Sequence, residues 1–326
     1  MPAAPLLEVR DLRVEFPQRR GTLRALDAVS FSIEAGEILG VVGESGAGKS
    51  LTGAAIIGLL EPPGRIAAGE VRLAGQRIDD LPAAALRRIR GRRIGAIFQD
   101  PLTSLNPLYT VGRQLIETIR THLPLDAAQA RERAIELLGE TGIPAPEARI
   151  DHYPHQFSGG MRQRVVIALA LAANPELIVA DEPTTALDVS IQAQVIGLLK
   201  RLCKDHGAAV MLITHDMGVI AEACDRVAVM YAGRIVEIGP VREVIHAPAH
   251  PYTVGLMGSI PAMDEDRERL LQIDGAMPRL NAIPSGCAFH PRCLRAIERC
   301  RRERPELEAA GTTRAACWLA HEAQAA

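Results

Sequence analysis

A glycine-rich segment between a buried strand and a helix constrains this chain most strongly. Residues 38–42 form a continuous apolar run, residues 43–50 read Gly-Glu-Ser-Gly-Ala-Gly-Lys-Ser, and residues 51–60 have helical character. A phosphate-binding loop needs this order of strand, loop and helix. Its glycines let backbone N–H groups curl around phosphate oxygens, and the helix N-terminus adds a favourable partial charge. The segment predicts ATP binding; the competing interpretation is a glycine-rich turn with a chance lysine.

Two side chains of this loop have predicted chemical roles. Lys49 is expected to neutralise the β- and γ-phosphates, and the Ser50 hydroxyl is expected to ligate Mg²⁺. Other ATP contacts are predicted at Gly43, Ser45, Gly46 and Gly48 of this segment and at Leu51, which follows it.

The rest of the chain has the rhythm of an α/β protein with insertions. Apolar runs at 177–180 and 210–213, separated by helical stretches, predict a mostly parallel sheet. Alternating segments near the N-terminus, 6–16 and 29–34, predict an antiparallel β subdomain. Residues 101–157 lack a buried strand and are predicted to be an inserted helical subdomain. After about residue 245 the chain becomes rich in Pro and Arg, so we divide it into a core, 1–245, and a small C-terminal appendage, 246–326.

Two carboxylates follow the apolar run at 177–180. Ligands of parallel sheets bind at the carboxyl ends of the strands, where Asp181 and Glu182 would lie. Asp181 is predicted to hold Mg²⁺, and Glu182 to polarise the water that attacks the γ-phosphate. Alone, an Asp-Glu pair could simply cap a strand; after a phosphate loop it indicates ATP hydrolysis.

A second glycine-rich helix start occurs at residues 157–164, Phe-Ser-Gly-Gly-Met-Arg-Gln-Arg. Ser158 is a good N-cap, and the two glycines expose backbone N–H groups. The segment is either an ordinary helix cap or a second anion-binding site, for which a chain with one phosphate loop has no use of its own.

These motifs resemble the nucleotide-binding cassette of ABC transporters over residues 6–245. The resemblance implies an ABC-type P-loop ATPase core, and it makes 158–160 the signature motif that contacts the γ-phosphate of ATP on a partner subunit. The signature departs from the commonest form at Phe157 and Met161. The residues expected to contact ATP in trans are Ser158, Gly159, Gly160 and Met161.

Further cassette motifs follow in the family's order. By resemblance, Gln99 is the Q-loop residue and a contact of Mg²⁺ and water, and His215 is the switch histidine that touches the γ-phosphate. Thr185-Ala186-Leu187-Asp188 resembles the D-loop, with Asp188 as its acidic residue. Phe16 is the aromatic expected to stack on adenine. The predicted catalytic residues are therefore Glu182, His215 and Gln99.

The tail resembles the C-terminal extension of bacterial dipeptide and oligopeptide importer ATPases. The matching segments are His250-Pro251-Tyr252-Thr253, Ser259-Ile260-Pro261 and the stretch 286–293. The resemblance implies an ATPase that energises import of di- or oligopeptides; importers of nickel or another small solute share parts of it. It also implies a second ABC ATPase subunit, two permeases, an extracytoplasmic binding protein and a location at the cytoplasmic side of the plasma membrane.

Four cysteines crowd into the tail, separated by five, six and sixteen residues: Cys287, Cys293, Cys300 and Cys317. A reducing cytosol argues against disulfides. Zinc sites usually have tighter spacings, whereas iron–sulfur clusters tolerate irregular ones and need four thiolates. We therefore predict a structural [4Fe–4S] cluster, with zinc or no metal as alternatives.

Composition limits the remaining functions. A net charge of −2 gives no support to nucleic-acid binding. The N-terminus lacks the features of a signal peptide, and no apolar run reaches the ~20 residues of a membrane span. A soluble ABC ATPase of DNA repair would carry long coiled coils between residues 49 and 158, where this sequence has no sustained heptads. A ribosomal ABC ATPase would usually carry two cassettes, and this sequence has one. A regulatory cassette without activity is disfavoured because Glu182 and His215 are both present.

Overall fold

The computed structural model describes residues 4–19, 21–185, 188–259 and 272–325. The chain divides into two compact units. The first comprises Ser32–Ile38 and Arg72–Leu212 with the residues up to Leu7, and the second comprises Glu8–Phe31, Leu39–Val71 and Ile213–Ala326.

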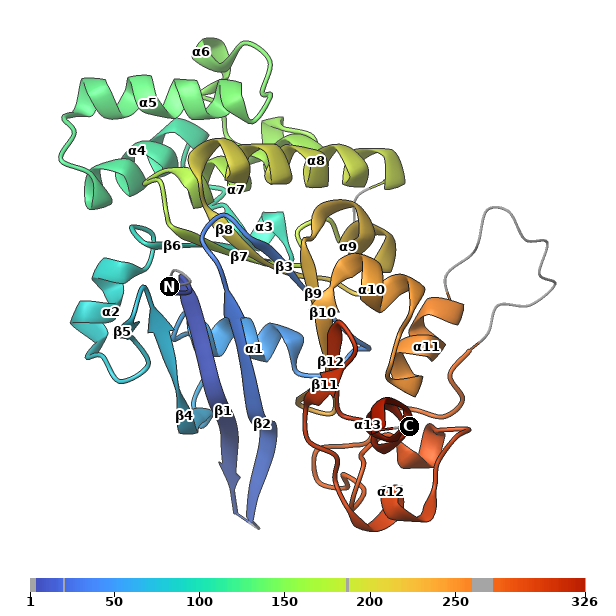
Figure 1. The fold of residues 1–326 in the computed structure, drawn as a ribbon. Coiled ribbons are helices and arrows are strands. Elements are labelled where there is room, and N and C mark those ends of the chain that lie inside the picture. The colour runs from blue at the N-terminus through green and yellow to red at the C-terminus, as the bar shows by residue number, and fades with distance from the viewer. Residues whose placement is uncertain (1–3, 20, 186–187, 260–271, 326) are drawn as a thin grey trace. The chain divides into compact units, whose positions relative to one another are not determined.

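The first unit contains parallel strands accompanied by helices (Figure 1). Strand β6 (Ile94–Ile97) pairs in parallel with β7 (Leu177–Asp181), which is followed in the sheet by β8 (Ala209–Ile213). All of β8 and the first four residues of β7 are buried, as expected for strands covered on both faces. The short strand β5 (Gln76–Arg77) pairs with the end of β4 (Arg65–Leu73).

The helices of this unit include the predicted helical subdomain. Between residues 101 and 156 the described chain forms helices and loops and no strand. Thr110 caps α4 by accepting from the N–H of Arg113, and Asp126 starts α5 with a capping box. Helices α4, α5 and α7 pack on one another. The helices are α2 (Ala83–Ile89), α3 (Pro101–Ser104), α4 (Val111–His122), α5 (Ala127–Glu140), α6 (Pro146–Arg149), η1 (Pro154–Gln156), α7 (Gly159–Leu171) and α8 (Val189–His206).

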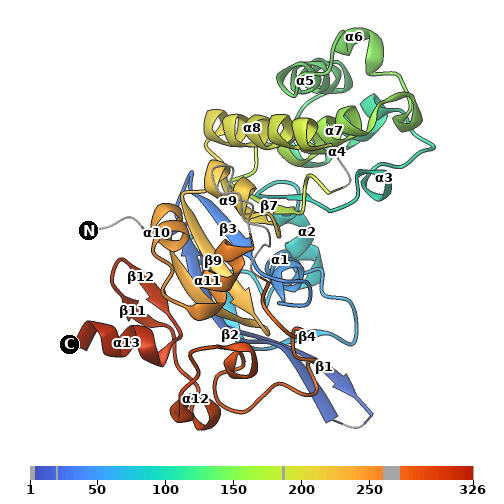
Figure 2. The ribbon, with the colours of Figure 1, turned by 90° about the vertical axis from the view of Figure 1, so that its right-hand side faces the viewer.

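The second unit contains the antiparallel β subdomain and the strand that leads into the phosphate loop (Figure 2). Strands β1 (Leu7–Gln18) and β2 (Gly21–Ile33) are neighbours in one sheet, and their buried residues largely alternate. In the other sheet β3 (Ile38–Val42) runs parallel to β9 (Arg226–Tyr231), and β10 (Arg234–Pro240) is antiparallel to β9. The phosphate loop therefore leaves from the carboxyl end of a buried parallel strand.

The residues after 245 extend this second sheet. Strand β12 (Thr313–Ala315) pairs with β10, placing Glu237 opposite Ala315, and β11 (Glu308–Ala310) follows at the edge. Strands of three residues are too short to show an alternating pattern, so the sequence did not predict them. The boundary at 245/246 stays a prediction. The unit's helices are α1 (Lys49–Ile56), α9 (Met217–Ala223), α10 (Val241–His246), α11 (Pro251–Gly258), η2 (His290–Arg292), α12 (Glu298–Arg302) and α13 (Trp318–Ala325).

Among the helices in the described part of the chain, none is both long enough and apolar enough to cross a membrane.

Candidate functional site

The phosphate loop starts where β3 ends. Gly43 has φ 155°, and a Cβ there would collide with the carbonyl oxygen of Met230 on β9. Gly48, at φ 104°, is the left-handed N-cap of α1. Both positions require glycine, Gly43 because of close approach and Gly48 because of its backbone conformation. The predicted loop is thus a tightly packed backbone turn at a helix N-terminus, which is suited to binding phosphate oxygens.

Lys49 is held inside this turn. The residue is only 6% exposed, and its Nζ donates to the carbonyl oxygens of Gly43 and Glu44 at 2.7 and 3.1 Å. The ammonium group lies therefore against the loop that it is predicted to serve. Ser45, Gly46 and Ser50 are exposed.

His215 is brought to the same end of the sheet in the second unit. The N–H of Thr214 donates to the carbonyl oxygen of Val41 at 3.1 Å, so the residues after β8 follow the end of β3. His215 is exposed, and Asp216 next to it caps α9 by accepting from the N–H groups of Gly218 and Val219. This geometry fits the predicted phosphate contact, which stays a prediction.

The first unit brings Gln99 and Glu182 together. Gln99 Nε2 donates to Glu182 Oε2 at 3.0 Å, and the Thr185 hydroxyl donates to the same oxygen at 2.9 Å. Glu182 has φ 46°, a left-handed conformation that a non-glycine residue rarely adopts and that costs about 1–3 kcal/mol. Such strain persists where the surroundings hold it, and here it directs the carboxylate toward Gln99. Asp181 lies one residue earlier, at the end of β7.

The predicted signature forms the start of α7. The Ser158 hydroxyl accepts from the N–H of Met161 at 3.3 Å, as the predicted N-cap requires. Ser158 and Gly159 are exposed, whereas Phe157 is buried and anchors the turn. Gly160 packs against α8, where a Cβ would lie 2.9 Å from Ile191 Cγ2. The start of α7 is therefore packed against α8 through Gly160, while Ser158 and Gly159 are exposed to solvent.

Phe16 and Asp188 are two further residues of the predicted site. The ring of Phe16 on β1 lies over the backbone of Gly64, where a Cβ would lie 2.7 Å from it, so the ring is partly buried within its own unit. Asp188 is exposed just before α8. Ala186 and Leu187 of the predicted D-loop, and Ile260 and Pro261 of the tail motif, lie outside the described residues.

The four tail cysteines line one small pocket together with side chains that include His250, Phe289 and Trp318. None is in a disulfide, and burial raises the pKa of Cys287 to about 11 and the pKa values of Cys293 and Cys317 as well. Across the described residues, no three His, Cys, Asp or Glu side chains are arranged to hold a metal ion. All four thiols line one pocket, but their positions in the described structure are not those of metal ligands, so the predicted iron–sulfur cluster stays a prediction.

Comparisons with known proteins agree with these motifs. The family "ABC transporter" matches residues 26–185, and the family "Oligopeptide/dipeptide transporter, C-terminal region" matches residues 236–300. The dipeptide transport ATP-binding protein DppD of Escherichia coli K12 is 48% identical over 302 residues, 93% of this chain and 92% of the relative. The chain belongs to the ATP-binding proteins of the ABC transporter family. The oligopeptide transport ATP-binding protein OppD of Salmonella typhimurium LT2 is 48% identical over 94% of this chain and 91% of its own length.

Solved ABC cassettes share the fold. A dimeric post-hydrolysis structure of the ATP-binding cassette MJ0796, bound to ADP and Pi, is 31% identical with a TM-score of 0.65, covering 72% of this chain and 99% of that chain. The protein cbiO1 of Clostridium perfringens, part of the ABC transporter complex cbiONQ, is 29% identical with a TM-score of 0.64, covering 74% of this chain and 91% of that chain. The predicted P-loop ATPase core is confirmed, and this ABC protein is an ATPase.

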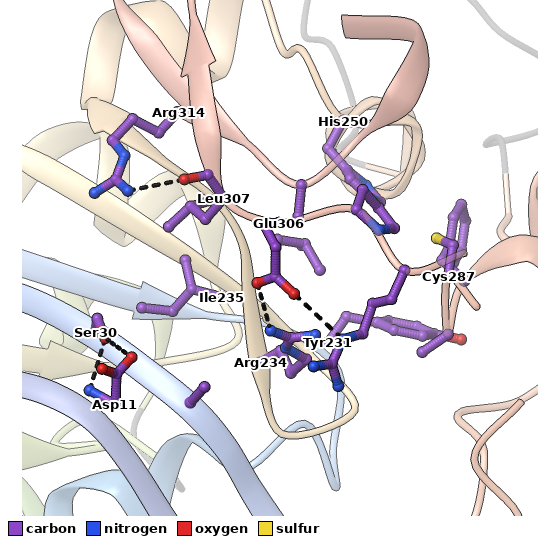
Figure 3. Close-up of a pocket in the computed structure, with 17 residues that line it drawn as sticks. Asp11, Ser30, Tyr231, Arg234, Ile235, His250, Cys287, Glu306, Leu307 and Arg314 are labelled. Carbon is purple, nitrogen blue, oxygen red and sulfur yellow. Dashed lines mark hydrogen bonds and ion pairs between the residues drawn. The ribbon is translucent and has the colours of Figure 1, made fainter. Parts of the chain in front are cut away.

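A pocket in the second unit of this ABC protein has no predicted role (Figure 3). Polar and charged side chains that line it bind one another: Arg234 pairs with Glu306 at 3.0 Å, and the Ser30 hydroxyl donates to Asp11 at 3.2 Å. Arg314 donates to the carbonyl oxygen of Leu307 at 2.8 Å. The ion pair of Arg234 with Glu306 joins the tail to β10, so we assign the pocket a structural role.

Sequence reasoning missed the residues that contact the phosphate loop of this ABC protein from the tail. Glu44 meets Tyr252 and Arg292, which lie 208 and 248 residues away along the chain. Tyr252 is part of the tail motif that the sequence singled out, but no periodicity or spacing connects it with the loop. A carboxylate beside a phosphate-binding glycine was the one available signal, since such a charge needs a cation nearby.

Proposed function

We propose that this ABC ATPase energises import of di- and oligopeptides across the bacterial plasma membrane. One observation carries the proposal: a phosphate loop holding a buried lysine occurs in the same chain as the oligopeptide/dipeptide transporter C-terminal region. The names of the relatives, which concern dipeptide and oligopeptide transport, support it.

ATP would bind at the phosphate loop. The backbone N–H groups between Gly43 and Gly48 would receive the phosphates, and Lys49 would turn its ammonium group from the loop carbonyls to the β- and γ-phosphates. Ser45, Gly46, Ser50 and Leu51 would contribute further contacts, and Phe16 would stack on adenine. Ser50, Gln99 and Asp181 carry oxygen ligands of the kind that Mg²⁺ prefers. Mg²⁺ supplies neutralisation of phosphate charge when it is bound.

Hydrolysis would depend on Glu182. Its carboxylate would polarise the attacking water, while Gln99 and Thr185, which both donate to Oε2, fix its orientation. A fixed carboxylate need not reorganise during the reaction, which is the basis of electrostatic preorganisation. His215 would contact the γ-phosphate.

The site would be completed by a second subunit. The open start of α7, with Ser158, Gly159, Gly160 and Met161, would contact ATP on a partner ATPase, and Asp188 would lie at that interface. The dimeric state of MJ0796 with ADP and Pi supports this arrangement. The partners would be a second ABC ATPase, two transmembrane permeases and an extracytoplasmic binding protein. Attached to the permeases, the chain would be peripheral on the cytoplasmic face.

The tail cysteines would hold a structural metal centre, a [4Fe–4S] cluster or zinc. The position of four cysteines, none in a disulfide, around one pocket supports this proposal. Anaerobic purification followed by absorption spectroscopy and iron and zinc analysis tests it. A brown, iron-containing protein supports the cluster, and a colourless protein without either metal contradicts the centre.

Peptide transport by the assembled complex tests the function. The complex in vesicles should accumulate a labelled dipeptide or oligopeptide when supplied with Mg–ATP, and Glu182→Gln should lower ATP hydrolysis by about 100-fold or more while retaining ATP binding. Full activity of Glu182→Gln would refute the catalytic assignment. Uptake of Ni²⁺ without peptide uptake would refute the substrate.

A further inference from the structure

Glu44 places a negative charge inside the loop that must receive the most highly charged part of ATP. It follows Gly43 directly, and the carbonyl oxygen of Glu44 accepts from Lys49 Nζ. An uncompensated carboxylate close to bound phosphates opposes their binding, because like charges repel strongly where water is partly excluded. The loop therefore needs a cation for Glu44 other than the lysine intended for phosphate.

Arg292 from the tail supplies that cation. Its Nη1 lies 3.1 Å from both carboxylate oxygens of Glu44, and its side chain is only 7% exposed. A charge-assisted contact of this kind is stronger than a neutral hydrogen bond, and burial limits its screening by salt. The two residues are far apart in sequence, so the tail must fold onto the loop to make the contact.

The position of Arg292 is fixed by other contacts of the tail. Its Nε donates to the carbonyl oxygen of Asp274 at 2.8 Å, and Nη2 donates to that of Ile273 at 3.2 Å. The guanidinium carbon lies about 6 Å from two aromatic rings, 5.9 Å from Tyr231 and 6.0 Å from Phe289. The arginine is thus held in place before ATP arrives, so binding does not have to order it.

Tyr252 holds the backbone of the same residue. Its hydroxyl accepts from the N–H of Glu44 at 2.9 Å. The tyrosine is buried and packs edge-on against Tyr231, with ring centroids 4.7 Å apart. At the start of its helix, His250 accepts from the N–H of Tyr252, and the buried carboxylate of Glu237 accepts from the N–H of His250 at 3.0 Å. This chain of contacts fixes the tyrosine hydroxyl against the loop.

From these contacts we propose that Arg292 and Tyr252 are positioning residues for ATP: Arg292 neutralises the Glu44 carboxylate, and Tyr252 fixes the Glu44 backbone. The C-terminal segment thereby sets the affinity of the phosphate loop for ATP. The inference rests on the proposed function in one respect, that ATP binds at Gly43–Ser50.

Calorimetric titration of the full-length chain with Mg–ATP at low ionic strength tests the charge argument. Arg292→Ala leaves the carboxylate uncompensated and should weaken binding about tenfold, whereas Glu44→Gln should tighten it about twofold. The double variant Glu44→Gln/Arg292→Ala should return to within about twofold of wild type, because neither charge remains. Tyr252→Phe should weaken binding about threefold through loss of one hydrogen bond.

Arg302→Ala is the matched control. Arg302 belongs to the same tail, pairs with Glu298 at 2.8 Å and is 76% exposed, so its loss should leave the affinity unchanged. A purely structural role for Arg292 predicts that the double variant binds no better than Arg292→Ala, and this result would overturn the proposal.

Two further outcomes are decisive. If Arg292→Ala does not fold, Glu44→Gln still decides, because a loss of affinity in that variant contradicts charge compensation. Wild-type protein that binds no Mg–ATP would instead overturn the proposed function.

Discussion

The two glycine-rich helix starts of this protein differ in what surrounds them. At α1 the cap is Gly48 in a left-handed conformation, the following lysine is buried, and Gly43 fits against the backbone of β9. At α7 the cap is the Ser158 side chain, and both Ser158 and Gly159 are exposed. The same local feature, a glycine-rich helix start, thus occurs in two settings: one start is enclosed and carries its own cation, and the other is presented outward.

The largest expected effect comes from removing Lys49, the cation at the enclosed start of α1. Lys49→Ala should lower ATP hydrolysis of the assembled complex by about 100-fold or more, because α1 then lacks the ammonium group for the β- and γ-phosphates. Lys204→Ala, an exposed lysine of α8, is the control and should retain activity. Hydrolysis within about twofold of wild type in Lys49→Ala would show that the enclosed start does not bind phosphate.

The second prediction concerns the tight packing of the loop before α1 and is measured as the free energy of unfolding. Gly43→Ala adds a Cβ that meets the Met230 carbonyl oxygen at a φ that alanine avoids, and should lower the free energy of unfolding by about 3 kcal/mol. Gly36→Ala is the control, with φ 73° and nothing within 4 Å of its Cβ, and should cost about 1 kcal/mol. Urea unfolding measures both. Equal losses would mean that close packing does not shape the enclosed loop.

Acid should destabilise the fold around α11, the helix that places Tyr252 beside the phosphate loop. Burial lowers the pKa of His250, which caps the helix carrying Tyr252, to about 3. Below about pH 6.5 the unfolded chain binds a proton at His250 that the folded chain does not. The free energy of unfolding therefore decreases by about 1.4 kcal/mol for each unit that the pH falls from 6.5 to 3, and it is independent of His250 above pH 6.5. His250→Asn keeps a capping acceptor but should remove this slope. Parallel pH profiles of the unfolding midpoint in the two proteins would contradict the assignment.

The smallest effect concerns the cap of the open start. Ser158→Ala removes the acceptor for the Met161 N–H and should cost about 1 kcal/mol of unfolding free energy, whereas Ser158→Asn should keep it. Thermal unfolding of the two variants side by side gives the difference. A stabilised or unchanged alanine variant would mean that the serine is kept for a contact with another molecule alone.

The sequence predicted the parts of this protein that depend on neighbours in the chain. The loop, its flanking strand and helix, the cap at Ser158 and the carboxylates at the end of β7 all follow from contiguous residues whose pattern has one good structural solution. Contacts between distant segments could not be predicted in this way. The pairing of β12 with β10 and the contact of Arg292 with Glu44 depend on how the tail returns to the core. The left-handed backbone of Glu182 is similarly imposed by its surroundings, since glutamate has no preference for that conformation.

The most direct test of the account replaces Ser158 by arginine and measures Mg–ATP binding of the isolated chain beside hydrolysis by the assembled complex. The account predicts that Ser158→Arg binds Mg–ATP like wild type in isolation but that hydrolysis in the complex falls by about 100-fold, because α7 is proposed to contact ATP held by another subunit. Loss of Mg–ATP binding by the isolated, folded Ser158→Arg chain, to the level of Lys49→Ala, would contradict it.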